Sequence, residues 1–229
     1  MDENYIKTSS IKSLKENKER SLHGKFVFIQ DPLPEDIDLD YVLDYIERRI
    51  PIHLFHLIAS ILVGDFNFLK ERDINASYME GAIYVTNNQH DEGDMIDDIV
   101  HELAHSVEEL FRNDIYIDRS IEEEFLGKRK RLCDVLNAEG IKVSKESCLE
   151  SEYDKNFDEF LYKDVGYEKL VNLTMGLFNS PYAVTSLREY FANGFEAYFI
   201  GDRKHVQNIS PFLYIKLDQI STYNKKQEF

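Results

Sequence analysis

Apolar residues recur every three or four positions along most of this 229-residue chain, which is the spacing of a helix that buries one face. Prolines and glycines interrupt the pattern at points where helices should begin or end. The pattern predicts helices over residues 41–46, 52–62, 95–111, 121–137, 167–178 and 184–200, and a last short helix from Ser210-Pro211.

Two short segments depart from helical spacing and have the composition of β-strands. Phe26-Val27-Phe28-Ile29 is a continuous apolar run that ends at Asp31-Pro32, so we expect a buried strand there. Residues 81–86, GAIYVT, are β-branched and aromatic, and a polar loop separates them from the helix predicted over 95–111. Few strands among many helices indicate an α+β, mostly helical fold with a small sheet.

The length and apolar content allow one large core or two small ones, and no internal repeat is present. We expect residues 1–22 to form a polar N-terminal arm and residues 23–229 to form a single domain. No run approaches the roughly 20 apolar residues that span a bilayer, and the N-terminus has no apolar signal core. The sequence therefore predicts a soluble protein of the cytoplasm or another intracellular compartment, unless a leader has been removed.

The formal net charge of −16 argues against nucleic acid and anionic membranes as partners. Residues 128–131 form the clearest basic cluster, which we interpret as a solvated helix face. The acidic balance can attract a basic protein or peptide substrate, or it can simply keep the protein soluble. Cys133 and Cys148 are too few for a disulfide framework and lack CxxC spacing, which favours buried or idle thiols in a reducing compartment.

A candidate metal-binding pattern is His101-Glu102-Leu103-Ala104-His105, an HExxH pattern inside the helix predicted over 95–111. This spacing places the two imidazoles one helical turn apart on one face, about 5–6 Å between Cβ atoms, so both can bind one metal ion. Zinc accepts imidazole nitrogens in tetrahedral geometry, and Glu102 beside them can act as a general base on a metal-activated water. The pattern predicts one zinc ion per chain, with coincidence as the alternative.

A catalytic zinc site also needs a third protein ligand and an open fourth position. Glu189 is the favoured ligand, because it stands among aromatic residues of the helix predicted over 184–200 and a buried acid needs a partner. Asn193 shares the face of Glu189 one turn later. Glu196 is the alternative ligand, although it fits the exposed side of the same helix equally well.

Other histidines and acids have plainer interpretations. His53 and His56 lie in an apolar segment and are interpreted as packed side chains, and His90 as a solvated loop residue. The acids around Asp94, Asp97 and Asp98 fall at the start of the HExxH helix. Negative charge is favoured there, so we interpret them as capping residues and not as ligands.

Three segments of the chain resemble the catalytic domain of anthrax lethal factor and its relatives, including the Pro-Pro endopeptidases. They are the HExxH pattern followed by Glu108-Glu109, the segment Glu189-Tyr190-Phe191-Ala192, and an aromatic segment over 210–220 that begins with proline. The resemblance covers about half of the chain, residues 81–112 and 182–220. It implies a zincin-like metallopeptidase fold in which the small sheet carries the 81–86 strand beside the active-site helix.

By this resemblance Glu189 is the third zinc ligand, and Tyr182 matches a tyrosine that assists at the transition state. Without the resemblance, Tyr182 is simply an aromatic residue at a turn after a proline. Glu108 and Asn193 are candidates for contacts that orient the ligands. Asn193 stands where relatives commonly have a second acid, so its contact with a zinc histidine would be neutral and weaker.

The segment between the two motifs is longer than in the relatives. Residues 113–180 look like an enlarged helical insertion that could cover the cleft and set specificity. Both cysteines lie inside this insertion, so a thiol that blocks the zinc is a minor alternative to a buried or idle one.

The sequence thus predicts a zinc-dependent endopeptidase in which Glu102 takes a proton from zinc-activated water and Tyr182 helps to stabilise the oxyanion. A peptide would bind along the 81–86 strand. One alternative is a catalytically weak or inactive zinc-binding or structural module on the same fold, such as a toxin-accessory or particle-associated protein. A zinc hydrolase of a non-peptide amide is a third possibility. The substrate and the oligomeric state stay open.

Overall fold

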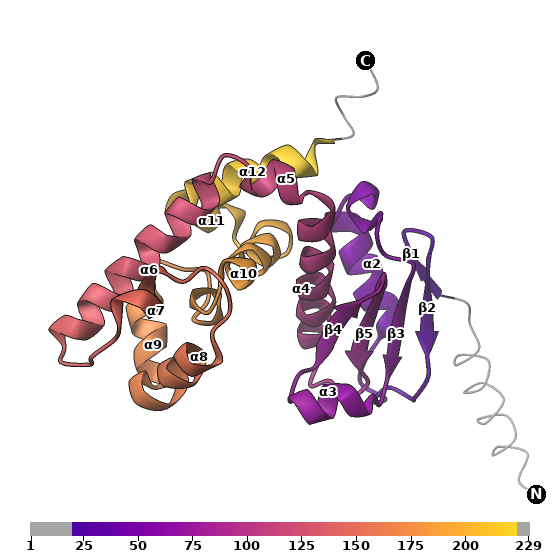
Figure 1. Ribbon diagram of the computed structural model, residues 1–229. Coiled ribbons are helices and arrows are strands. Elements are labelled where there is room, and N and C mark those ends of the chain that lie inside the picture. The colour runs from indigo at the N-terminus through magenta and orange to yellow at the C-terminus, as the bar shows by residue number, and fades with distance from the viewer. Residues whose placement is uncertain (1–19, 224–229) are drawn as a thin grey trace, which may run out of the picture. The chain divides into compact units, whose positions relative to one another are not determined.

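A computed structural model describes residues 20–223 of the chain. Its contacts divide the chain into two compact units, Met1–Leu103 and Ala104–Phe229. The boundary falls inside helix α4 (Glu92–Leu110), which carries the HExxH pattern (Figure 1). The single domain expected from the sequence is therefore built from two units.

The first unit contains a five-stranded mixed sheet in the order β1-β2-β3-β5-β4. Its strands are β1 (Arg20–Leu22), β2 (Lys25–Ile29), β3 (Ser60–Gly64), β4 (Ala76–Met79) and β5 (Ala82–Thr86). Strands β2, β3 and β5 are parallel, and β1 and β4 pair antiparallel at the two edges. The predicted α+β class is confirmed at this level.

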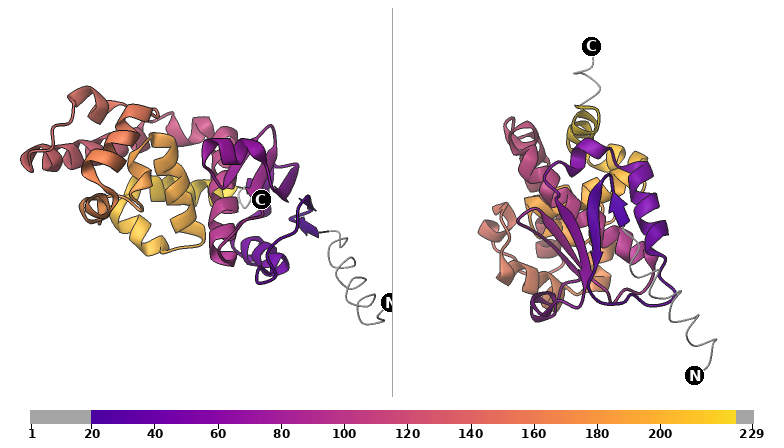
Figure 2. Two further views of the ribbon diagram at one scale, coloured as in Figure 1. Left: turned by 90° about the horizontal axis from the view of Figure 1, so that it is seen from below. Right: turned by 90° about the vertical axis from the view of Figure 1, so that its right-hand side faces the viewer.

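One face of this sheet is buried and the other is partly open. Alternate residues such as Ile61, Val63, Ile83 and Val85 have no exposed surface. Helices α2 (Leu39–Arg49) and α3 (Asn67–Arg72) belong to the same unit, and the right-hand view of Figure 2 looks onto the strands of the sheet. The burial alternates because successive strand side chains point to opposite faces.

Several predictions for this unit need correction. Residues 52–62 do not form one helix but a 3-10 turn, Ile52–Phe55, and then strand β3. The apolar run SILVG fits a buried strand and a buried helix equally well by periodicity alone. The strand at 26–29 is confirmed, but Phe26 and Phe28 are 62% and 50% exposed, so it is buried on one side only.

Two further corrections concern the N-terminal arm and the histidines. Residues 20–22 are part of the sheet as β1, and a tight turn through His23 and Gly24, both with positive φ, returns the chain into β2. The predicted arm over residues 1–19 lies outside the described part of the chain. His53 is half-buried and His56 exposed, so neither is a packed core residue.

The second unit is helical. Its helices are α5 (Arg112–Tyr116), α6 (Ser120–Ala138), α7 (Lys145–Leu149), α8 (Lys155–Phe160), π-helix η2 (Leu161–Val165), α9 (Tyr167–Thr174), 3-10 turn η3 (Tyr182–Val184), α10 (Leu187–Phe199), α11 (Arg203–Ile209) and α12 (Pro211–Ser221). Figure 1 shows α6 as a long helix with α7 beside its C-terminal end. The helices predicted over 121–137, 167–178 and 184–200, and the last one from Pro211, are confirmed with small shifts of their ends.

A polar network is buried where α6, α10 and α12 come together. The Lys128 ammonium donates to the Tyr190 hydroxyl at 2.7 Å and to the Ser210 hydroxyl at 2.6 Å. Tyr190 in turn donates to Glu124 at 2.8 Å, and Glu124 also accepts the backbone N–H groups of Phe212 and Leu213. Burial lowers the pKa of Lys128 to about 8, against the attraction of Glu124.

Arg129, the next residue of α6, is fully buried. Its guanidinium donates to the carbonyl of Glu150 at 2.6 Å and lies 4.1 Å from the centre of the Phe157 ring. The prediction of a solvated basic face is therefore wrong for Lys128 and Arg129, and confirmed for Lys130 and Arg131, which are exposed. Lys128 is compensated by hydrogen bonds, and Arg129 by the hydrogen bonds of one guanidinium nitrogen and by neighbouring aromatic faces, none of which periodicity alone reveals.

The two cysteines form a disulfide, Cys133–Cys148, that joins α6 to α7. Idle thiols were the wrong prediction, and a thiol that blocks zinc is excluded because neither cysteine is free. Disulfides persist mainly in oxidising compartments, so the bond counts against the expected reducing compartment. None of the helices in residues 20–223 combines the length and the apolar character needed to cross a bilayer.

Candidate metal centre

Helix α4 positions the HExxH residues, and its sequence favours a helix both at its capped start and along its buried apolar face. Asp91 caps the first turn by accepting the Asp94 N–H at 2.9 Å, and acids in this turn suit the positive end of the helix dipole. Its apolar face is fully or almost fully buried at Met95, Ile99 and Leu103. The capping prediction is thus confirmed for the start of the helix.

The structure brings the three pattern residues together. One potential ligand atom from each of His101, Glu102 and His105 lies within 4.8 Å of the others. It is the one group of three or more such residues found in the described part of the chain. Their closeness follows from helical spacing, since positions i, i+1 and i+4 share one side of the helix.

Glu102 is held by the edge strand of the sheet. One of its carboxylate oxygens accepts the backbone N–H of Tyr78, in β4, at 2.6 Å. A hydrogen bond between a charged acceptor and a backbone donor is among the stronger ones in proteins, so it fixes the position of the carboxylate. No pattern in the sequence indicates this contact, because it joins residues 24 positions apart in the chain.

Asp98 has a larger role than the capping function predicted from the sequence. Its carboxylate accepts a hydrogen bond from the Gln89 side chain at 2.9 Å. Burial raises the pKa of Asp98 to about 6, while the nearby His101 lowers it. Asp98 lies one turn before His101 on the same helix, and this i, i+3 spacing is the signal that could have singled it out.

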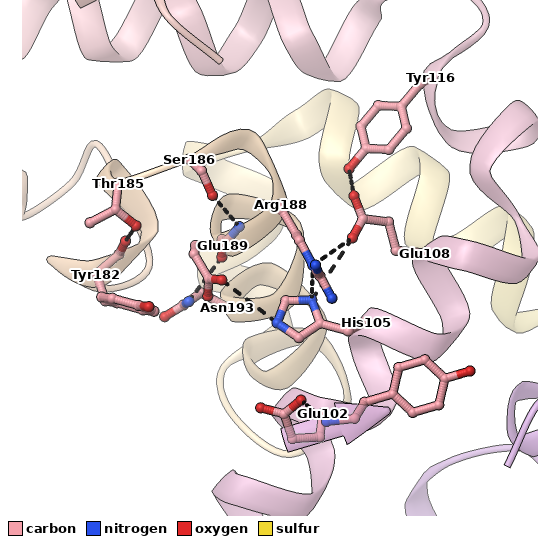
Figure 3. A network of polar contacts seen from close by, with 11 residues as sticks. Glu102, His105, Glu108, Tyr116, Tyr182, Thr185, Ser186, Arg188, Glu189 and Asn193 are labelled. Carbon is pink, nitrogen blue, oxygen red and sulfur yellow. Dashed lines mark hydrogen bonds and ion pairs between the residues drawn. The ribbon is translucent and has the colours of Figure 1, made fainter. Parts of the chain in front are cut away.

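In the second unit, His105 lies next to Glu189. The distance between His105 Nε2 and Glu189 Oε1 is 3.6 Å, and the two side chains are 7% and 13% exposed (Figure 3). Two ligand atoms at about 2.0–2.1 Å from a tetrahedral zinc ion are about 3.3–3.4 Å apart. The pair is therefore spaced almost as two ligands of one zinc ion would be.

The start of α10 explains why Glu189 is placed there. Ser186 caps the helix by accepting the Glu189 N–H at 3.1 Å, and Tyr190 and Phe191 anchor the first turn in the core. Glu196, the alternative ligand, lies seven residues further along the helix, about 10 Å along its axis from Glu189. The geometry therefore favours Glu189 over Glu196.

The other ring nitrogen of His105 lies in a charged cluster. Arg188 Nε donates to His105 Nδ1 at 3.0 Å, and Glu108 Oε2 lies 3.8 Å from the same nitrogen (Figure 3). Tyr116 donates to the other oxygen of Glu108 at 2.6 Å. Burial and the charge of Glu108 raise the pKa of the Tyr116 hydroxyl well above 10, so it stays a donor.

This cluster supports Glu108 as the residue that orients His105. A histidine that binds metal through Nε2 carries a proton on Nδ1, and that proton needs an acceptor. The Glu108 carboxylate can accept this proton after a small movement toward Nδ1, whereas the Arg188 guanidinium can only donate. Arg188 and Tyr116 were not identified from the sequence. Arg188 immediately precedes the candidate ligand Glu189, which in hindsight is a usable signal.

Asn193 makes hydrogen bonds to the turn before α10 and to the first turn of α10. Its amide oxygen accepts a short hydrogen bond from the Ser180 hydroxyl, and its amide nitrogen donates to the Glu189 carbonyl at 2.9 Å. Ser180 also accepts the N–H of Ala183 at 3.2 Å. Through these contacts Asn193 ties the turn of Tyr182 to the helix of Glu189. That Asn193 also weakly orients a zinc histidine stays a prediction.

Tyr182 is accessible at this turn. Its side chain is 49% exposed, and its carbonyl accepts the Thr185 hydroxyl at 2.9 Å. Figure 3 shows the tyrosine on the turn that leads into α10. A hollow of about 550 Å³ also opens beside His105, and its lining includes Glu108, Glu109 and Arg188.

No family model, no curated protein and no solved structure matches this chain. The assignment of the site therefore depends on the geometry and chemistry of its residues.

Proposed function

We propose that the protein is a zinc-dependent endopeptidase. The observation that carries the proposal is the position of His105, which belongs to the HExxH group and also lies 3.6 Å from Glu189. Two imidazoles and one carboxylate are a known ligand set of catalytic zinc, which keeps a fourth position open for water or substrate. His101, His105 and Glu189 would hold the ion. Zinc, when bound, supplies Lewis-acid activation of water and of the scissile carbonyl.

Glu102 would transfer the protons of the reaction. A carboxylate fixed by the Tyr78 N–H can accept a proton from the attacking water and later donate it to the leaving amine. One oxygen of the Glu102 carboxylate accepts this N–H. The lone pairs of the other oxygen can accept the proton. The contact thus orients the base without neutralising it.

Tyr182 would donate a hydrogen bond to the oxyanion that forms during attack. Removing one such donor typically costs about 2.7–4 kcal/mol of transition-state stabilisation. The Asn193–Ser180 contact holds the turn on which Tyr182 lies. In this proposal Asn193 is a positioning residue, because it acts through Ser180 and not on the substrate.

A peptide substrate would bind at strand β4 and not at β5. The sequence pointed to the 81–86 strand, but β5 pairs with β3 on one side and with β4 on the other. Strand β4 is the edge of the sheet, and it supplies the N–H that holds Glu102. An extended peptide can add to such an edge through backbone hydrogen bonds.

The main alternative is a zinc-binding or structural module without turnover. Metal content and activity separate the two. Protein purified without chelator should contain about one zinc per chain by elemental analysis. Glu189→Ala should lose the metal, whereas the matched control Glu196→Ala should keep it.

Cleavage is measured on a peptide library with the same preparations. Glu102→Gln should keep the zinc and lose cleavage, because it removes the base but no ligand. Zinc-free wild-type protein would overturn the proposal. Zinc bound without cleavage of any peptide would favour the binding module, and turnover of non-peptide amides alone would favour the third candidate.

A further inference from the structure

A second hollow lies in the helical unit, in the segment between the two motifs. It has a volume of about 370 Å³ and is bordered by α8, η2, α9 and the turn that carries Tyr182. Its apolar walls come from six residues: Leu161, Tyr162, Tyr167, Leu170, Pro181 and Tyr182. We refer to this hollow as the tyrosine pocket.

The pocket combines a fixed floor with accessible walls. Leu161 and Leu170 are 1% and 6% exposed, so they are held by the core of the unit. Three tyrosines leave 70%, 61% and 49% of their surface exposed, at Tyr162, Tyr167 and Tyr182 respectively. Single exposed aromatic residues are ordinary, but three around one hollow mark a binding surface.

Three polar residues that line the pocket, Asp158, Glu159 and Thr185, have partners within the unit. The Thr185 hydroxyl donates to the Tyr182 carbonyl, so it does not need an acceptor from a ligand. At the rim, Glu159 is paired with Lys163 at 2.7 Å. Asp158 accepts the neutral hydroxyl of Tyr153 at 2.8 Å, so its negative charge is not cancelled by that contact.

These features indicate which kind of side chain the pocket would bind. A cavity of about 150 Å³ lined by apolar side chains is enough to hold a benzene ring, so this pocket has room for a large aromatic or long aliphatic side chain. The charge of Asp158 favours a Lys or Arg next to that side chain, as does the net charge of −16.

The position of the pocket connects it with the proposed reaction. Tyr182 forms one wall, and its hydroxyl is the proposed oxyanion donor. A side chain in contact with the Tyr182 ring therefore belongs to a residue close to the scissile bond. The other walls come from residues 161–170, which lie in the segment that the sequence analysis singled out as a possible source of specificity.

We infer that the tyrosine pocket is a specificity subsite that receives a large apolar side chain of the substrate, beside the scissile bond, with a basic residue next to that side chain. The inference depends on the proposed peptidase function for its biological meaning. The preferential binding of such peptides can be measured without catalysis.

The chain contains no tryptophan, so the emission of a tryptophan in a peptide is not obscured by the protein. The probe is the blocked hexapeptide Ala-Ala-Trp-Lys-Ala-Ala, titrated with the zinc-loaded Glu102→Gln variant. Binding in the pocket should shift its emission to the blue. Peptides with Leu, Ala or Asp in place of Trp are then used as competitors, and only the Leu peptide should compete well.

Substitutions of residues that line the pocket test whether the peptide binds there. Tyr162→Ala and Tyr167→Ala remove exposed walls and should each weaken binding about tenfold. Tyr41→Ala, an equally exposed tyrosine on α2 that is 52% accessible, should leave it unchanged. Asp158→Asn should weaken binding up to about fivefold, and only for peptides with the neighbouring Lys.

The outcomes separate this inference from the proposed function. Equal binding of the Trp and Ala peptides, or binding that tolerates both tyrosine variants, overturns the inference even if wild type cleaves peptides. Selective binding that both tyrosine variants weaken supports the subsite. If wild type then cleaves no peptide of the library, the peptidase proposal fails, while the pocket stands as a binding site for large apolar side chains.

Discussion

Exchanging the Glu124 carboxylate for the amide of glutamine should destabilise the protein by about 2–3 kcal/mol. The side chain keeps its shape, but three hydrogen bonds lose a charged acceptor: those from Tyr190, Phe212 and Leu213. Hydrogen bonds to charged groups contribute about 1.5–3 kcal/mol, against about 0.5–1.5 kcal/mol for neutral ones. The Lys128 ammonium also loses the attraction that offsets its burial.

A double-mutant cycle isolates the electrostatic part. Lys128→Met alone removes the buried cation together with its desolvation cost, so it should change stability by less than about 1 kcal/mol. In Glu124→Gln/Lys128→Met no unpaired cation remains, and about 1–2 kcal/mol of the loss from Glu124→Gln should be recovered. Urea unfolding followed by far-UV circular dichroism gives the four free energies of unfolding.

The control is Glu123→Gln, an exposed neighbour of Glu124 in the first turn of α6, with an expected change within about 0.5 kcal/mol. If Glu124→Gln costs no more than this control, the network does not stabilise the protein. If the two substitutions are additive, Glu124 and Lys128 do not interact, and the account of the buried cation is wrong.

Four further predictions follow from the described contacts. Because burial lowers the pKa of Lys128 to about 8 from 10.5, the folded state releases this proton before the unfolded state does. The free energy of unfolding of wild type minus that of Lys128→Met should therefore rise with pH above about 8, by up to about 1.4 kcal/mol per pH unit. If this difference is the same at pH 7 and pH 9.5, the prediction is wrong. Asn193→Ala should lower kcat about tenfold or more with intact zinc content, since it frees the turn of Tyr182, and an unchanged kcat would exclude the positioning role. Glu108→Gln should weaken zinc affinity about 10–100-fold in a chelator competition, while Glu109→Gln should not. Cys133→Ala/Cys148→Ala should lose about 3 kcal/mol of stability, and reducing agent should lower the Tm of wild type but not that of the variant.

The local parts of the site could be predicted from the sequence, because helical geometry fixes them. His101, Glu102 and His105 are close together on any helix, and the Ser186 cap and aromatic anchors of α10 also act within a few residues. By contrast, the contact of Tyr78 with Glu102 joins two elements through a backbone atom, and no residue pattern encodes it.

The errors have a common physical origin in tertiary contacts. Strand β3 differs from the predicted helix because a short run of apolar residues shows no period: Leu62 on the partly open face is as apolar as Ile61 and Val63 on the buried face. Lys128 and Arg129 were assigned to solvent because their partners lie far away in sequence, from Glu150 to Ser210. The disulfide was missed because local signals show where α6 ends and α7 begins, but not that Cys148 packs against Cys133.

The bond from Tyr78 to Glu102 has a consequence for how this protein can vary over generations. The donor is a main-chain N–H, which every amino acid except proline supplies. Mutation at position 78 can therefore exchange the side chain while the proposed general base, Glu102, keeps its backbone partner. Diversification of the edge strand is in this way uncoupled from the proposed chemistry, so substrate preferences can change there without passing through inactive intermediates.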